Sequence, residues 1–441
     1  MTKSSLALSN LRGFAILMVV AFHSCIAYLN SQPDAALPFD IPPYGWRANP
    51  IVDSARWLGF DLFCAFQYSY LMQLMFFLSG LFVWPSLSRK GGRKFLYDRF
   101  LRLGVPFVIG LYVLMPVAYY PVYRVTAVDP SWSAFWSHWI ALPFWPSGPM
   151  WFLWLLLLFN LAAAGLFWLA PRAGEALGGL SAKAGSRPGR FFIALVSISA
   201  LAYLPLAAVF EPWQWMQFGP FAFQPSLAPQ YAVYFFAGLG VGAYGFERGL
   251  LEGDGMLARR WPRWLLGTTA AFLLWVVPTA LVVQGATFPG LRLVANLGLV
   301  LCAASACFAL AAAFLRFARR HRPVFESLAD NAYGIYLVHY VFVIWLQYML
   351  LHAPLFAVAK AAIVFTGTLT LSWAITTAIC RVPIGARLMG RNRRELARAR
   401  TASAAALPAT IDDRRSVALS GGKPKKFIRR EHFRSDPSGH C

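Results

Sequence analysis

Arg12 and His23 are the ionisable residues of "LRGFAILMVVAFHSC", an apolar run near the start of the chain, and ten residues separate them. A charged group near the bilayer centre costs about 2.5–3.5 kcal/mol on insertion scales, so such residues usually have a function. Arg12 also suits a simpler role, that of an anchor at the cytoplasmic boundary of the helix. His23 is either a buried histidine that hydrogen-bonds across helices or, as a neutral imidazole, a general base.

A second polar stripe is predicted in "ADNAYGIYLVHYVFVIW", where Tyr333, Tyr336, His339 and Tyr340 are spaced at i, i+3, i+6 and i+7. This spacing places them on one face of an otherwise apolar helix. The stripe is either a structural network of hydroxyl groups or part of a site. In the second case His339 is a candidate catalytic residue beside His23.

Two basic residues of "RFLRLGVP", Arg99 and Arg102, are predicted to share one helix face near the cytoplasmic end of a span. Paired guanidinium groups suit phosphate recognition because their planar forks match phosphate oxygens. The alternative is a topology anchor, for which any basic residues would serve.

Weaker candidates are Ser79 in "FFLSG" and Trp151 in "MWFL". Small residues late in a span more often serve helix packing than chemistry. Trp151 is one of six tryptophans between residues 132 and 154, most of which an interfacial aromatic belt explains. One or two of them are candidates for stacking on a sugar ring.

Long helices must hold these residues, and the composition favours them. The 441 residues are 58% hydrophobic and 13% charged, which is typical of polytopic membrane proteins and not of soluble domains. Runs of about 20 apolar residues give ten predicted spans: 11–30, 61–84, 101–121, 149–170, 191–210, 229–246, 264–284, 291–315, 331–351 and 356–380. The predicted fold is all-α, a membrane helical bundle of about ten transmembrane helices.

The charge of the connecting loops predicts the orientation. Loops 85–100, 171–190, 247–263 and 316–330 are rich in arginine and lysine, whereas the other loops are poor in them. By the positive-inside rule, the rich loops and both termini are cytoplasmic. The formal net charge of +22 is therefore a topology signal and an attraction to anionic lipid, and no nucleic-acid partner is expected.

Two regions are predicted along the chain, a membrane domain at 1–385 and a basic cytoplasmic tail at 386–441. The tail holds 14 Lys/Arg against 5 Asp/Glu and has no apolar periodicity, so we expect it to be disordered and dispensable for chemistry. The six cysteines show no metal-ligand or disulfide spacing, and no metal site is expected.

Together these motifs resemble the acyltransferase 3 family of integral-membrane acyltransferases. The matching elements are Arg12 with His23, "FFLSG" at 76–80, Arg99 with Arg102, "MWFL" at 150–153 and "YGIYLVH" at 333–339. They occur in the family's order across most of residues 8–385. The pair "RLGVP" and "MWFL" looks closer to the glucan-succinylating branch than to the O-antigen acetylases.

The resemblance implies transfer of an acyl group from a cytoplasmic acyl-CoA ester to a hydroxyl of an outward-facing carbohydrate or glycolipid, in a bacterial inner membrane. It implies His23 and His339 as catalytic residues, no permanently bound cofactor, and membrane lipids as further partners. The residues expected to bind the donor are Arg12, Arg99 and Arg102. Those expected to contact the substrate are Tyr333, Tyr336, Trp151 and Ser79.

Two other classes of function remain open on the sequence. A transporter or flippase of a lipid-linked sugar would use the same intramembrane histidine and arginines as a proton-coupled or anion-binding path. A membrane scaffold would use them only to hold helices together. We find no internal repeat of the kind that marks many transporters.

Overall fold

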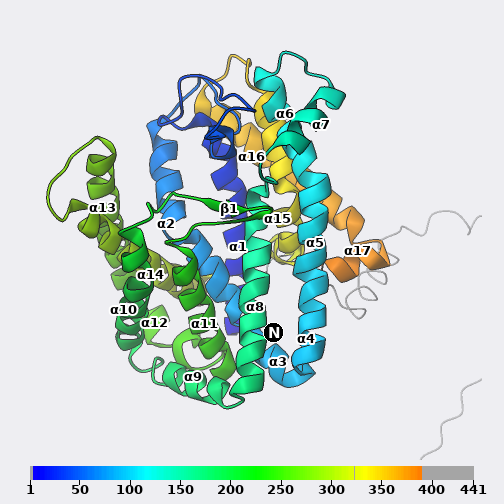
Figure 1. Ribbon diagram of the computed structural model, residues 1–441. Coiled ribbons are helices and arrows are strands. Elements are labelled where there is room, and N and C mark those ends of the chain that lie inside the picture. Colours follow the sequence, from blue (N-terminus) through cyan, green and yellow to red (C-terminus); the bar gives the residue numbers. More distant parts are fainter. Residues whose placement is uncertain (1–2, 322, 390–441) are drawn as a thin grey trace, which may run out of the picture. The chain divides into compact units, whose positions relative to one another are not determined.

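The structure, a computed structural model, describes residues 3–321 and 323–389 and consists mainly of long helices (Figure 1). In this part of the chain, nine helical segments are long and apolar enough to cross a membrane. They are Ser4–Tyr28, Leu58–Lys90, Gly92–Thr126, Gly148–Leu169, Pro188–Ala207, Trp261–Val283, Leu291–Phe317, Pro323–Met349 and Ala357–Ile379. The prediction of an all-α polytopic membrane protein is confirmed.

The long helices are α1 (Lys3–Cys25), α2 (Leu58–Gly80), α8 (Trp151–Leu169), α10 (Pro188–Ala207), α13 (Trp261–Val283), α14 (Leu291–Phe317), α15 (Pro323–Met349) and α16 (Ala357–Ile379). Shorter helices are α3 (Val83–Lys90), α7 (Trp132–Ala141), α9 (Ala173–Ala182), α11 (Ala228–Tyr244), α12 (Met256–Arg259) and α17 (Pro383–Leu388). Single 3-10 turns occupy Ile26–Tyr28, Gly45–Arg47, Gly148–Met150 and Gly249–Leu251. Strands β1 (Met216–Phe218) and β2 (Phe221–Phe223) pair antiparallel, with Gln217 opposite Ala222.

The third span is a long helix with two π-helical turns. It comprises α4 (Gly92–Arg99), a π-helical turn at Phe100–Gly104, α5 (Val105–Ile109), a second π-helical turn at Gly110–Leu114, and α6 (Met115–Thr126). Such turns are rare and occur frequently at functional sites. Arg99 ends α4 and Arg102 lies in the first π-helical turn, so the regular α-helical spacing expected between them is not kept.

The sixth predicted span, 229–246, is not among these nine segments of the described chain, which corrects the expected number of ten: it forms α11, a helix of only 17 residues that packs against α2. A Cβ atom on Gly80 would lie 2.1 Å from the carbonyl oxygen of Phe235, and one on Gly238 would lie 2.1 Å from that of Phe77. No side chain fits at these distances. The two backbones therefore approach closely because glycines face each other, as the small residues of this segment predict.

The first helix begins earlier than its apolar run suggests. We expected a span at 11–30, but α1 starts at Lys3 and the apolar segment starts at Ser4. Arg12 is nine residues after Lys3, about 14 Å along the helix. Arg12 thus lies more than two turns inside the helix, and its role as an anchor at the membrane boundary stays a prediction.

The predicted tail at 386–441 overlaps α17, which ends at Leu388, and from residue 390 onward it lies outside the described residues. The prediction that this tail is disordered and dispensable therefore stays a prediction.

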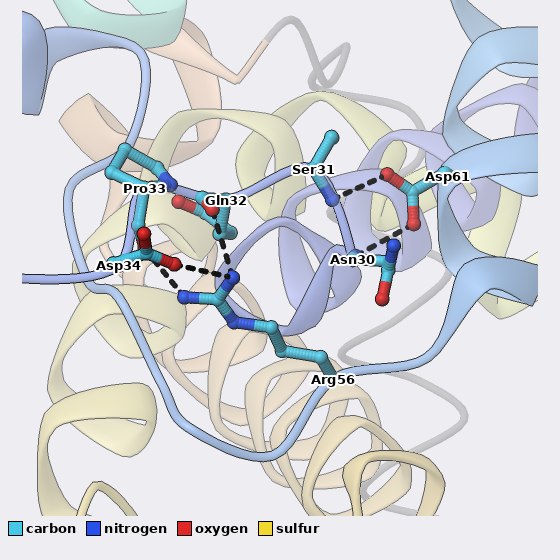
Figure 2. Close-up of polar contacts among 7 residues, drawn as sticks. All are labelled: Asn30, Ser31, Gln32, Pro33, Asp34, Arg56 and Asp61. Atoms are coloured by element: carbon cyan, nitrogen blue, oxygen red, sulfur yellow. Dashed lines mark hydrogen bonds and ion pairs between the residues drawn. The ribbon is translucent and has the colours of Figure 1, made fainter.

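Residues 31–57, named here the outer segment because the loop charges predict that they face the outside, are held by polar contacts at both ends of the segment (Figure 2). At the end of α1, the backbone N–H groups of Asn30 and Ser31 donate to the carboxylate of Asp61, at 2.7 and 2.9 Å. Near the start of α2, the guanidinium of Arg56 lies 3.6 Å from the carboxylate of Asp34. The contacts of Asp61 tie the start of the outer segment to α2, and the contact of Arg56 with Asp34 joins the two ends of the segment to each other.

A buried ion pair also fixes the outer segment to α16. Nζ of Lys360 lies 2.9 and 2.8 Å from the two carboxylate oxygens of Asp53, and both side chains are almost completely buried. Nζ also lies 3.3 Å from the carbonyl oxygen of Leu351, and the backbone N–H of Ala55 donates to Asp53 at 2.8 Å. These contacts satisfy much of the hydrogen-bonding capacity of both ions, which burial of a charged pair requires.

Candidate active site

His23 and His339 lie against each other where α1 packs on α15. Nδ1 of His23 is 3.4 Å from Nε2 of His339, and the ring centroids are 5.0 Å apart. His339 is fully buried, whereas His23 is partly exposed. The two histidines, predicted separately from the sequence, therefore form one pair.

Backbone carbonyls determine where the protons of neutral imidazoles lie in this pair. Nδ1 of His339 is 2.6 Å from the carbonyl oxygen of Tyr336, and Nδ1 of His23 is 2.8 Å from that of Val19. A carbonyl oxygen only accepts hydrogen bonds, so each Nδ1 carries the proton and donates it. Nε2 of His339 then has its lone pair directed at His23. Nε2 of His23 has no hydrogen-bond partner among the described residues, so its lone pair is available to a substrate.

Aromatic rings and an amide surround the pair. The ring of Tyr340 lies 5.5 Å from that of His23, and its hydroxyl is 3.3 Å from the hydroxyl of Tyr119. Nε2 of Gln347 donates to the carbonyl oxygen of His23 at 2.9 Å. Tyr119 and Gln347 are not among the residues predicted from the sequence. Gln347 is a polar residue in an apolar span, which is a usable signal, but Tyr119 looks like an ordinary interfacial tyrosine.

Arg12, Arg99 and Arg102 form an arginine cluster nearer the end of the bundle that the charge distribution assigns to the cytoplasm. Arg99 interacts electrostatically with both Arg12 and Arg102. The guanidinium of Arg12 lies 5.6 Å from the ring centroid of Phe82, and that of Arg99 lies 5.0 Å from the ring centroid of Phe95. The structure thus brings all three predicted donor-binding arginines together from two helices.

The first π-helical turn and α15 meet at this cluster. The hydroxyl of Tyr333 donates to the backbone carbonyl of Arg102. Asp330, three residues earlier on α15, interacts electrostatically with Arg12. Three guanidinium groups repel one another in a medium of low dielectric constant. The carboxylate of Asp330, together with that of Asp98, which acts on Arg99, offsets part of this repulsion. An arrangement of this kind favours an anionic ligand.

The arginine cluster and the histidine pair are joined by the same two helices. Along α1, Arg12 and His23 are about 16 Å apart, and along α15, Tyr333 and His339 are about 9 Å apart. Tyr336 lies between these levels, and its hydroxyl donates to the carbonyl oxygen of Pro149. The predicted stripe on α15 therefore runs from one cluster to the other.

Trp151 and Ser79 are not brought to the histidine pair by any contact in the described part of the chain. Trp151 is partly exposed, and its ring lies 5.3 Å from that of Trp215 and 5.9 Å from that of Tyr231. Ser79 is partly buried in α2 and its side chain makes no hydrogen bond with the described residues. Their predicted roles in substrate binding stay predictions.

Comparison with known proteins bears on the same part of the chain. The family model Acyl_transf_3, described as an acyltransferase domain, matches residues 5–377. No curated protein and no solved structure matches the chain. The matched region contains the arginine cluster, the histidine pair and all but the outermost residues of the spans, so the chain belongs to the acyltransferase 3 family and is a membrane acyltransferase.

Proposed function

We propose that this enzyme is an O-acyltransferase of a bacterial inner membrane. It moves an acyl group, of the acetyl or succinyl type, from a cytoplasmic acyl-CoA-like donor to a hydroxyl of an outward-facing carbohydrate or glycolipid. The observation that carries the proposal is the partly exposed His23, whose Nε2 lone pair is available and which shares a helix with Arg12 of the arginine cluster.

The arginine cluster suits the donor. Arg12, Arg99 and Arg102 bind the phosphates of the coenzyme A moiety, which carries several negative charges. The pantetheine arm then extends along α1 and α15, past Tyr333 and Tyr336, and places the thioester near His23. The cluster lies on the side of the bundle that the loop charges assign to the cytoplasm, where such a donor is available.

The chemical step uses Nε2 of His23 as the base. The acceptor's hydroxyl oxygen attacks the carbonyl carbon of the thioester, and Nε2 takes the hydroxyl proton. The C–S bond breaks as the C–O ester bond forms, and the imidazolium returns its proton to the thiolate sulfur. The products are an ester and a free thiol, and His23 is neutral again. A positioned base of this kind typically contributes about 10²–10⁴-fold to the rate.

The acceptor approaches from the opposite side. His23 lies near the end of α1 that leads into the outer segment, two residues before the helix ends at Cys25. Trp151 has part of its ring exposed beside Trp215, which precedes β1. Stacking of a sugar ring on exposed tryptophan is a common mode of carbohydrate contact, and we assign Trp151 this role.

Reconstitution into vesicles of known orientation tests the proposal. A labelled acyl thioester is supplied on the face that carries loop 85–100, and a hydroxyl acceptor from the cell envelope is confined to the other face. We expect labelled ester on the acceptor and free thiol released in equal amount. A transporter or flippase would move an intact molecule and release no thiol. Cysteine labelling that placed loops 85–100 and 122–148 on one side would overturn the assumed topology.

A further inference from the structure

Arg47 is a half-buried arginine of the outer segment that the catalytic proposal does not use. Its guanidinium donates to Oε1 of Gln217 at 2.9 Å and, at 3.4 Å each, to the carbonyl oxygens of Tyr44 and Pro43. One face of the guanidinium covers the ring of Phe144, 4.4 Å from its centroid. A guanidinium has five N–H groups, and these contacts use three, so two lack an acceptor among the described residues.

The other arginines expected on the outer side are in different surroundings. Arg56 faces Asp34, and Arg292 forms an ion pair with Glu211. Arg124 is exposed to solvent. Arg47 combines partial burial with the lack of a carboxylate partner in the described residues, and burial lowers the pKa of Arg47 from its ordinary value. A bound anion would offset this cost of desolvation.

Arg47 is connected to the histidine pair through buried aromatic rings. The adjacent residue, Trp46, is fully buried, and its ring lies 5.2 Å from that of Tyr119. The hydroxyl of Tyr119 is 3.3 Å from that of Tyr340, whose ring lies 5.5 Å from His23. Tyrosine rings therefore separate Arg47 from the histidine pair.

Three outer segments hold the guanidinium in place. Arg47 belongs to the outer segment, Phe144 to the loop before α8, and Gln217 to β1. Gln217 is itself fixed, because its Nε2 donates to the carbonyl oxygen of Trp145 at 2.8 Å. The ends of the outer segment are tied by the contacts of Asp61 and Arg56 (Figure 2). A cation held in this way is preorganised for a ligand, which reduces the entropy lost on binding.

We propose that Arg47 binds an anionic group of the acceptor, a carboxylate or a phosphate, while a hydroxyl of the same acceptor reaches His23. This inference rests on the proposed function and names the class of acceptor. Because tyrosine rings separate Arg47 from the histidine pair, the anionic group and the acylated hydroxyl lie on different units of an extended acceptor. Specificity for acidic glycans then comes from Arg47, and the chemistry comes from His23.

The experiment uses the envelope glycan fraction that the full-length enzyme acylates, in three forms. One form is untreated, one has its carboxylates reduced to alcohols, and one has its phosphates removed. For the parent enzyme, we expect one of the two treatments to raise the acceptor KM by about tenfold or more, because a charge-assisted hydrogen bond is lost. The treatment that does so identifies the anion.

The variants are Arg47→Gln, Arg47→Lys and, as a matched outer control, Arg124→Gln. We expect Arg47→Gln to raise the KM for the untreated acceptor by the same factor and to leave the KM for the neutralised acceptor and for the donor unchanged. Arg47→Lys should restore part of the affinity, and Arg124→Gln should behave as the parent. Equal losses by Arg47→Gln on untreated and neutralised acceptors, or no loss on either, would overturn the assignment.

Equilibrium binding of the radiolabelled, untreated and neutralised fractions to the enzyme in nanodiscs separates this inference from the proposed function. If the parent transfers no acyl group, the proposed function fails, but the binding data still decide the role of Arg47. Charge-dependent binding that Arg47→Gln abolishes supports the site. Binding that is independent of the acceptor's charge refutes it. Size-exclusion profiles and thermal unfolding of each variant show whether it is folded.

Discussion

His339 is expected to act through His23, and replacing it tests the tautomer assignment. His339→Phe keeps a planar ring in the buried site but removes the Nε2 lone pair that faces Nδ1 of His23 at 3.4 Å. When Nε2 of His23 takes the acceptor's proton, the imidazolium becomes a cation in a site of low dielectric constant. Nε2 of His339 accepts a hydrogen bond from the Nδ1–H of His23 and thereby stabilises the His23 imidazolium. That interaction is stronger in the transition state than with neutral His23, so its loss lowers kcat.

The magnitude follows from the geometry. A hydrogen bond to a charged group contributes about 1.5–3 kcal/mol. The 3.4 Å separation is long, and the carbonyl oxygen of Val19, at 2.8 Å, shares the same proton. We therefore take the lower end, about 1.5 kcal/mol, which corresponds to a decrease of slightly more than about tenfold in kcat. The donor KM should not change, because the arginine cluster is untouched.

The assay is thiol release coupled to ester formation, measured with saturating donor and acceptor. His339→Gln offers an amide oxygen as a replacement acceptor and should recover part of the rate. Tyr340→Phe is the matched control, because it keeps the ring that contacts His23 and removes only its hydroxyl. An unchanged kcat in His339→Phe, or the same decrease in Tyr340→Phe, would refute the reasoning.

Three further predictions follow from the described contacts. His23→Ala should reduce acyl transfer by about 10²–10⁴-fold in a protein that still inserts, measured as ester formation in vesicles; near-normal turnover would exclude His23 as the base. Arg99→Lys with Arg102→Lys should weaken binding of a coenzyme A ester, measured by equilibrium titration, because lysine keeps the charge but loses the fork; unchanged affinity would leave them as anchors. Lys360→Met alone should destabilise the fold by about 3–5 kcal/mol, and adding Asp53→Leu should recover most of this loss in thermal unfolding; equal stability of the single and double variants would contradict a buried ion pair.

The membrane fold could be predicted from the sequence because its signal is local. A run of about 20 apolar residues is sufficient to identify a span. Nine of the ten predicted spans overlap segments of the described chain that are long and apolar enough to cross a membrane, and their ends differ by up to nine residues. The shifts matter at α1, where the helix extends back to Lys3 through less apolar residues. Tertiary packing stabilises these extra turns, and hydropathy does not detect them.

The residue types of the site were also predictable, because ionisable groups are rare inside spans. Arg12, His23 and His339 stand out for this reason alone. Tyr119 does not, since a tyrosine near the end of a span is common. Lys360 lies near the start of α16, where a lysine usually reaches the membrane surface, but the structure pairs it with Asp53.

The sequence by itself determined the class of protein, nine of the spans and the residue types that could carry chemistry, whereas the orientation given by the positive-inside rule stays a prediction. Each depends on composition within a short window or on a helical period. Only the tertiary structure decided which residues meet: His23 with His339, 316 positions apart, and Asp53 with Lys360, 307 apart. A helical period identifies the face on which a side chain lies but not the partner helix that covers it. That partner is decided by how all the helices pack together, as are the tautomers of the histidines and the position of Arg47.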